Sequence, residues 1–540
     1  MFKKHHLLGM LAAICMVMAL VCSCGRQGGQ SSISDEAGAP NESSASTDPD
    51  SSGNSETNSV GTENVQTDIV RIYTVGNEPG GWSQAQEAIN ERTRKELGLE
   101  IDVTFAGWDN YSSKLQMELA TGEQYSWVYD STWVALSADL AAGYYQPLDD
   151  LLPKYAPDVV KMKTQTVLDA NKNAGPDGEY HLYALPNGSA HAPTYQVWIR
   201  KDLREAMNMD EITSWDDLIE YMYAVKEHYP DMYPLSPESN SGTQNQAMMS
   251  MQCHLDQTPG YMNVTGLSNE GIIYMKENDG KYYNIFDDMP EAMWDSILQA
   301  RQLYLDGIID PDVMTGTSDK FYEGTQAVLY KMDLGVNGNL VDKLKTIVPE
   351  AEVEAVNFYD YTQTGQVITD FKAGDFMCMP VTCTNPEPAL KFFNWLCQSQ
   401  ENYDMLESGV KGVTWDEIGT NQYTYNSDLW ERFSWSIFRL PQYERLDANF
   451  TSKEVDEIMN NWRNVDWFTQ SVTTGFGFDP SSLSADISAY NSATSQYWYV
   501  IANGAADPEE TMAQYREAAY DAVVNIQKEM QAQLDAYLAK

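Results

Sequence analysis

Three tryptophans stand at equivalent places in the first quarter of the chain. Trp82, Trp108 and Trp133 each come shortly after a segment of apolar residues. A flat indole can bury the C–H face of a sugar ring, while Asp, Asn, Glu and Arg side chains can bond its hydroxyls. The whole chain is rich in such rings, with 14 Trp and 33 Tyr. The pattern indicates a carbohydrate-type ligand, although packing in the core is the ordinary alternative for each single ring.

The segments around these tryptophans predict the elements that position them. Residues 69–75, 100–105 and 127–129 have the composition of strands, and the two helical patterns between them, 82–97 and 111–121, each stop at a glycine. Strands that alternate with helices are typical of a parallel α/β sheet, which binds ligands at the carboxyl ends of its strands. We therefore expect the three tryptophans to gather at one edge of the sheet.

Further along the chain, turn and capping residues mark other elements. Asp177-Gly178 and Asp279-Gly280 lie between aromatic runs and predict two β-hairpins. Ser214 is a candidate helix cap, a helix is expected over about 386–399, and Asp507 is expected to cap a long C-terminal helix. The apolar stripe of that last helix is expected to pack in a core, and it consists of Met512, Tyr515, Ala519, Val523, Ile526, Met530, Leu534 and Tyr537.

The N-terminus has the pattern of a secretory signal. Two lysines precede the apolar run 7–21, which is too short to span a bilayer comfortably, and Cys24 follows it. The placement of Cys24 resembles the bacterial lipobox, which implies cleavage after residue 23 and a lipid anchor, such as palmitate, on Cys24. An ordinary secretory signal with a chance cysteine is the alternative. Residues 24–67 contain no aromatic residue and no Leu, and are expected to form a disordered linker.

Composition bounds the class of the remaining chain. Residues 68–540 exceed one typical domain of about 100–200 residues, so two or more lobes are expected. The formal net charge of −45 argues against nucleic acid as a partner. Four cysteines lie beyond the N-terminal segment without any metal-binding spacing, namely Cys253, Cys378, Cys383 and Cys397. Free buried thiols are expected, and a disulfide is the alternative that export permits, with Cys378 and Cys383 nearest in sequence.

Several stretches, in order, resemble one known family. The segments 143–152, 198–203, 321–328 and 402–412 are similar to segments of the extracellular solute-binding proteins of ABC importers, family 1, in its large LipO-like lipoprotein branch. The resemblance covers nearly the whole body of the chain. No single motif is specific to the family, whereas the ordered set is.

The resemblance implies a two-lobed, periplasmic-binding-protein-like (type II) α/β fold with a hinge. Lobe 1 is then 68–187 plus about 375–420, and lobe 2 is 188–374 plus about 421–540. It implies an extracytoplasmic, monomeric lipoprotein that captures an oligosaccharide between the lobes and delivers it to membrane permease subunits. It implies neither catalysis nor a cofactor, and the loop 227–234 lacks the acidic spacing that calcium requires.

The predicted binding residues combine the strand-end positions with residues from the resembling segments. Stacking is assigned to Trp82, Trp108, Trp133 and Tyr195, polar contacts to Asn77, Glu78, Asp130, Asn385 and Lys411, and the far wall to Phe476 with Phe478. The acidic body favours a neutral oligosaccharide. A peptide-binding lipoprotein of the same fold remains an alternative, as does a secreted glycoside hydrolase, since chance carboxylate pairs are abundant among 79 acidic residues.

Overall fold

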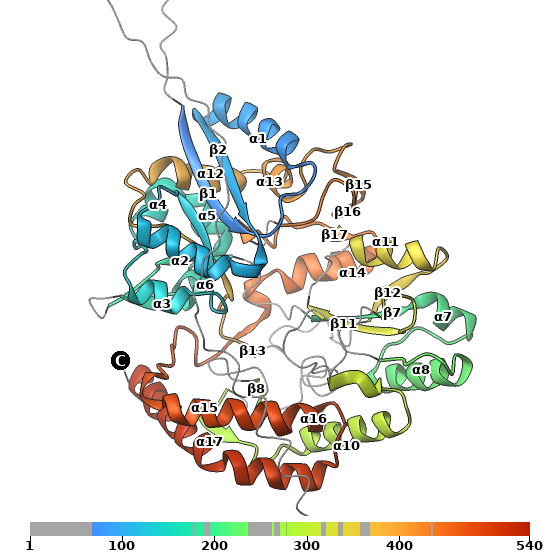
Figure 1. Ribbon diagram of the computed structural model, residues 1–540. Coiled ribbons are helices and arrows are strands. Elements are labelled where there is room, and N and C mark those ends of the chain that lie inside the picture. Colours follow the sequence, from blue (N-terminus) through green and yellow to red (C-terminus); the bar gives the residue numbers. More distant parts are fainter. Residues whose placement is uncertain are drawn as a thin grey trace, which may run out of the picture. The chain divides into compact units, whose positions relative to one another are not determined.

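A computed structural model describes residues 67–539 of the chain except for nine internal gaps (Figure 1). The gaps are 176–178, 188–194, 236–261, 264–270, 277, 315–319, 333–337, 357–367 and 434–435. All described residues belong to one compact unit, 65–540. The predicted signal, the anchor on Cys24, nearly all of the linker, Cys253 and most of the first predicted lobe crossing lie outside the described residues.

A five-stranded sheet forms the first part of the fold, in the order β2-β1-β3-β14-β6. Its strands are β1 Asp68–Val75, β2 Leu99–Ala106, β3 Trp127–Ser131, β6 Ala184–Asn187 and β14 Asp375–Cys378. β1 pairs in parallel with β2 and with β3, whereas β14 runs antiparallel between β3 and β6. The predicted alternation of strands and helices is confirmed, because α1 (Trp82–Leu97) and α2 (Tyr111–Thr121) connect the first three strands.

Both of these helices end as the sequence predicts. Gly98 and Gly122 follow α1 and α2 in the left-handed conformation, with φ of 73° and 78°, and their backbone N–H groups bond carbonyls of the last helical turn. A residue without a β-carbon adopts this conformation without strain. The helices therefore stop where the chain must turn back into β2 and β3.

The first core packs around this sheet. Its buried side chains come from two stretches of chain, Val70 to Leu185 and Ala373 to Leu440. The other elements of these stretches are η1 Trp108–Asn110, α3 Leu136–Ala141, α4 Leu151–Tyr155, α5 Pro157–Lys163, α6 Gln165–Ala170, β4 Asn173–Ala174, β5 Tyr180–His181, α12 Glu387–Leu396, α13 Gln400–Glu407, β15 Trp415–Gly419 and β16 Gln422–Tyr425. β4 pairs antiparallel with β5 on either side of the first predicted hairpin turn.

A second core lies around an antiparallel sheet of order β11-β7-β12. It draws on the stretches Val197 to Val356 and Leu446 to Ile458. Its elements are β7 Tyr195–Arg200, α7 Lys201–Ala206, α8 Trp215–His228, η2 Pro311–Met314, β11 Val328–Met332, α11 Gly338–Ile347, β12 Val353–Val356, β17 Leu446–Asp447, α14 Ser452–Glu457 and η4 Ile458–Trp462. The predicted cap of α8 is confirmed, since Ser214 and Asp217 form a complete capping box.

A third core contains the C-terminal helices. Figure 1 shows α16 and α17 beside α10, and contacts join each of the pairs α15–α17, α16–α17, α10–α16 and α10–α17. The predicted stripe of α17 is confirmed, because six of its eight residues are buried in this core and Met512 and Tyr537 pack against it. The elements are β8 Met262–Asn263, β9 Ile273–Met275, β10 Tyr282–Asn284, α10 Glu291–Leu305, η6 Ser481–Leu483, α15 Ser484–Ala493, η7 Thr494–Trp498, α16 Tyr499–Ala502 and α17 Pro508–Leu538. β9 and β10 form the second predicted hairpin.

A small fourth cluster is built on Val167, Ala170, Phe371, Trp467 and Phe468. The cluster lies beside η5 Val465–Trp467 and the short parallel pair β13 Ile368–Thr369 and β18 Thr469–Gln470. Its residue Phe371 comes just before Ala373, where the second stretch of the first core begins.

A buried ionic cluster lies where the chain leaves the first core at Leu440 and joins the second at Leu446. Glu444 is ion-paired with Arg432 at 3.1 Å, Arg439 at 2.5 Å and Arg463 at 3.5 Å. Burial opposes ionisation, yet Arg439 and Arg432 hold the pKa of Glu444 well below its usual range. The cluster thus links the segment between the two cores through ion pairs whose charges are largely buried.

The described residues contain free cysteines but neither a membrane-spanning helix nor a group of metal ligands. Cys378, Cys383 and Cys397 are free and buried, as expected. In the part of the chain that the structure describes, no helix has the combination of length and hydropathy needed to cross a membrane. Over the same residues, no three His, Cys, Asp or Glu side chains are grouped so that they could hold a metal ion.

Candidate functional site

The carboxyl edge of the first sheet brings the ends of several strands together. β1, β2 and β3 are parallel and therefore end at the same edge, with β1 in the middle. In a sheet of this order the crevice beside the central strand is the usual ligand site. β14 is antiparallel to β3, so this edge also receives the first residue of β14, Asp375, which pairs with Ser131 and Asn187.

Trp108 and Trp133 are two exposed aromatic residues at this edge. Trp108 opens the short helix η1 after β2, and Trp133 lies two residues beyond β3. Their ring centroids are 5.9 Å apart and their planes differ by 18°. Trp108 is 49% exposed and Trp133 is 55% exposed, so the stacked pair keeps much of its apolar surface in water. Two large exposed aromatic rings held together in this way form a platform for a flat apolar face.

Asp375 lies directly beside this platform and is not among the residues predicted from the sequence. Its Oδ1 accepts hydrogen bonds from Trp133 Nε1 at 3.1 Å and from the Tyr129 hydroxyl at 2.5 Å. Burial raises the pKa of the Asp375 carboxyl, and the two hydrogen bonds oppose that rise. No hydrogen bond to Oδ2 occurs among the described residues. Asp375 thus fixes the plane of Trp133 and keeps a second carboxylate oxygen for another donor.

Asp130 does not offer its carboxylate to a ligand, contrary to the sequence prediction. It is 0% exposed. Its Oδ1 accepts from the backbone N–H groups of Ser131 at 2.7 Å and Ala135 at 3.2 Å, and its Oδ2 accepts from the Tyr145 hydroxyl at 2.8 Å. Burial raises the pKa of Asp130 to about 7. Asp130 is a positioning residue that folds the loop carrying Trp133 back on itself.

Trp82 does not have the stacking role predicted for it. It is 2% exposed and packs edge-on against Phe105 and Phe433, with centroids 5.5 Å and 5.1 Å away. As the first residue of α1, it points back into the first core, where Phe433 arrives from a distant part of the chain. Its ring is part of the packing and not of the platform.

The remaining predicted residues fall in three groups. Asn77 and Glu78 follow β1 at the carboxyl edge and are exposed, so the structure keeps them beside the platform edge. Asn385 is exposed but follows the end of β14, which lies at the opposite edge of the sheet because β14 is antiparallel. Tyr195 begins β7, and its side chain lies outside the described residues.

Lys411 and Phe476 make structural contacts. Lys411 forms an ion pair with Glu417 at 2.9 Å and lies over the Trp415 ring. Phe476 is 6% exposed in the third core, and its neighbour Phe478 packs against the same core. Phe476 was predicted to line the far wall of the site, whereas in the structure its ring is covered by the C-terminal helix at Tyr537.

Comparisons with known proteins bear on what this site does. The model of the family described as bacterial extracellular solute-binding protein matches residues 77–402, and a domain of unknown function matches residues 472–539. A carbohydrate ABC transporter substrate-binding protein of Streptococcus pneumoniae serotype 4 is 20% identical over 498 residues, which are 87% of this chain and 91% of that protein. The fructooligosaccharide ABC transporter substrate-binding protein FusA of the same organism is 26% identical over 180 residues, which are 30% of this chain and 32% of that protein.

Solved structures resemble the whole described body. The crystal structure of an N-glycan transport solute-binding protein, NgtS, from Streptococcus pneumoniae has a TM-score of 0.69 and 18% identity, covering 88% of this chain and 100% of that chain. A human-milk-oligosaccharide (HMO) binding, ABC-transporter-associated solute-binding protein from Bifidobacterium longum infantis has a TM-score of 0.58 and 16% identity, covering 87% and 99%. These likenesses confirm the predicted two-lobed α/β fold.

Proposed function

The chain belongs to the family of bacterial extracellular solute-binding proteins, and we propose that its solute is an oligosaccharide bound on the Trp108–Trp133 platform. Proteins of this family are the substrate-binding components of ABC transporters, act outside the cytoplasm and are not enzymes. The observation that carries the proposal is the pair of exposed, nearly parallel indoles at the carboxyl edge of the first sheet. The carbohydrate names of the relatives support the same class of ligand.

The platform binds a sugar by burying its apolar face. A pyranose or furanose ring laid on an indole loses water from its C–H face without losing the solvation of its equatorial hydroxyls. In this arrangement Asp375 Oδ2 accepts a hydrogen bond from such a hydroxyl, while Oδ1 stays bonded to Tyr129 and Trp133. Asn77 and Glu78 supply further polar groups at the same edge. None of these steps breaks a bond in the ligand.

The two lobes of the fold capture the oligosaccharide, and the permease subunits in the membrane transport it. We take lobe 1 as the part of the chain around the first core, which extends to Leu440 and so beyond the boundary at about 420 that the resemblance implied. Lobe 2 is then the part around the second and third cores, and closing one lobe onto the other covers the platform. The loaded protein then delivers the oligosaccharide to permease subunits. Cys24 carries the lipid that keeps the protein at the outer face of the membrane. The net charge of −45 favours a neutral glycan over a polyuronate.

Isothermal titration of the full chain in detergent micelles tests this function. The panel contains high-mannose N-glycan fragments, fructooligosaccharides, milk oligosaccharides, a polyuronate and short peptides, and each mixture is afterwards chromatographed for cleaved sugar. The proposal expects saturable binding of at least one neutral glycan with the glycan recovered intact. Tighter binding of a peptide or the polyuronate, or release of shorter sugars, contradicts it. Neither the peptide-binding nor the hydrolase alternative gains support from the known relatives.

A further inference from the structure

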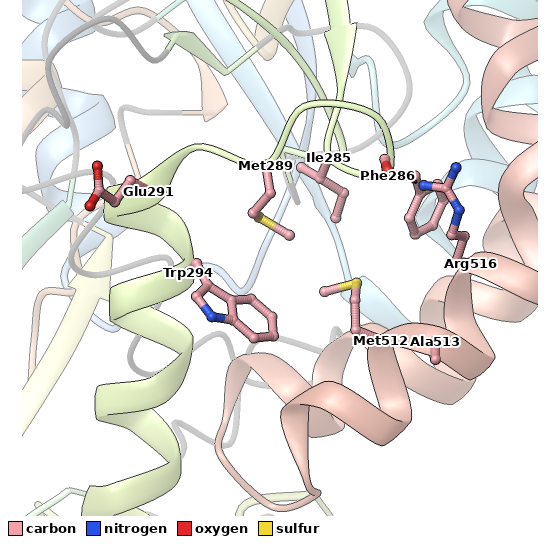
Figure 2. A pocket seen from close by; sticks show the side chains of 8 residues that line it. All are labelled: Ile285, Phe286, Met289, Glu291, Trp294, Met512, Ala513 and Arg516. Carbon is pink, nitrogen blue, oxygen red and sulfur yellow. Dashed lines mark hydrogen bonds between the residues drawn. The ribbon is translucent and has the colours of Figure 1, made fainter.

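A concave site lies at the third core, apart from the first sheet. A cavity of about 400 Å³ opens between the start of α10 and the first turns of α17. Figure 2 shows the side chains of Met289, Trp294 and Met512 directed toward one another across it. Ile285 contributes to the same apolar wall. This volume is within the range of sites that hold a small molecule or a large side chain.

The walls of this cavity are both apolar and adaptable. Met289, Trp294 and Met512 are only half-buried, so part of each side chain is not packed in the third core. Methionine side chains are unbranched and polarisable, and they adjust to partners of different shape. One helical turn beyond Trp294, Leu298 is 43% exposed on the same face of α10, so apolar surface continues past the cavity.

The surface around the cavity is strongly acidic. Glu291 and Asp295 of α10 and Glu509 and Glu517 of α17 are exposed, and none of them forms an ion pair among the described residues. The one cation that lines the cavity is Arg516, which stands opposite Glu291 in Figure 2. Arg516 is already engaged, since it pairs with Asp287 at 3.2 Å and lies over the Tyr520 ring. The net field at the opening is therefore negative.

We propose that this cavity is a docking site for a basic segment of a protein partner that inserts an apolar side chain. An apolar anchor fills the space between Trp294 and Met512, and flanking Lys or Arg residues meet the four unpaired carboxylates. The exposed Leu298 extends the contact beyond the cavity, which suits a chain segment better than a compact ligand. If the importer function proposed above is correct, the partner is the set of permease subunits in the membrane. Only this identification of the partner depends on the importer function.

Three labelled synthetic peptides, titrated against the full chain by fluorescence anisotropy, test the proposal. KKFLKK has both required features, KKSSKK lacks the apolar anchor, and EEFLEE reverses the charge. Saturable binding of KKFLKK is expected, with KKSSKK weaker by about tenfold or more, because burying a large apolar side chain accounts for at least that factor. EEFLEE is expected not to bind, and salt is expected to weaken KKFLKK because exposed charges are screened. Equal binding of KKFLKK and KKSSKK, or no saturable binding of KKFLKK, overturns the proposal.

Matched variants separate this site from the sugar platform. Ala513→Trp fills the cavity from an exposed position on α17 without removing any packing, and Trp294→Ala removes a wall. Both are expected to weaken KKFLKK by about tenfold while leaving glycan binding unchanged. Trp133→Ala is expected to do the reverse. Peptide binding that survives Ala513→Trp contradicts the docking site alone, and glycan binding that survives Trp133→Ala contradicts the platform alone.

Discussion

Replacing Trp133 by alanine should weaken oligosaccharide binding by about twentyfold. Trp133 is 55% exposed, which for a side chain of about 250 Å² leaves roughly 140 Å² in contact with water. A sugar ring that covers one face removes about half of this area, roughly 70 Å², from water. At about 25 cal/mol per Å² the loss is about 1.8 kcal/mol, or about twentyfold in the dissociation constant.

The companion variant Trp133→Phe removes the hydrogen bond to Asp375 while keeping a smaller aromatic ring. Phenylalanine keeps a flat ring but has no N–H donor for Asp375 Oδ1, which Trp133 bonds at 3.1 Å. We expect a loss of about fivefold, since a hydrogen bond to a charged group contributes roughly 1 kcal/mol or more. Isothermal titration with the glycan selected from the panel measures both variants, and Trp294→Ala in the third core is the matched control. If Trp133→Ala binds within about twofold of the parent chain while its circular dichroism is unchanged, the platform reasoning is refuted.

Three further changes test the roles assigned to buried residues. Glu444→Gln leaves three arginines without their shared carboxylate. It should lower the free energy of unfolding, measured in urea, by about 3–5 kcal/mol. A decrease of less than about 1 kcal/mol would show that the cluster does not stabilise the fold. Trp82→Ala should destabilise the chain by about 3–5 kcal/mol yet leave the glycan dissociation constant within about twofold, and a larger binding loss would return Trp82 to the site. Asp130, with its pKa raised to about 7 in the folded chain, holds a proton that the unfolded chain releases near pH 4, so folding stability falls as pH rises between these values. Asp130→Asn should flatten that part of the urea-unfolding profile, and an unchanged slope would show that the decline comes from other groups.

Local pattern predicted the elements whose residues interact with near neighbours in sequence. The capping box of α8 at Ser214 and the eight-residue stripe of α17 follow directly from short-range rules, and both appear in the structure as expected. The first three strands were also predicted from residues close together in the sequence, and so were the two helices between them, which each end at a glycine. The same rules placed Trp108 and Trp133 at one edge, because parallel strands end together.

The errors come from contacts between residues far apart in the chain. Trp82 has the same position after a strand as the other two tryptophans, but Phe433 and Trp430 cover its ring. Asp375 enters the site only because β14 inserts antiparallel beside β3, and this insertion also moves Asn385 to the opposite edge. Asp130 is different, since its backbone partners lie only one and five residues away, and the turn-forming run Asp130-Ser131-Thr132 was a local signal for a loop-holding carboxylate.

A crystal structure of the chain with a bound neutral oligosaccharide tests the central claim most directly. The account predicts a sugar ring lying flat on the Trp108–Trp133 pair, with one of its hydroxyls within hydrogen-bond distance of Asp375 Oδ2 and every glycosidic bond intact. An oligosaccharide bound elsewhere with both indoles uncovered, or a cleaved product in the site, would contradict it.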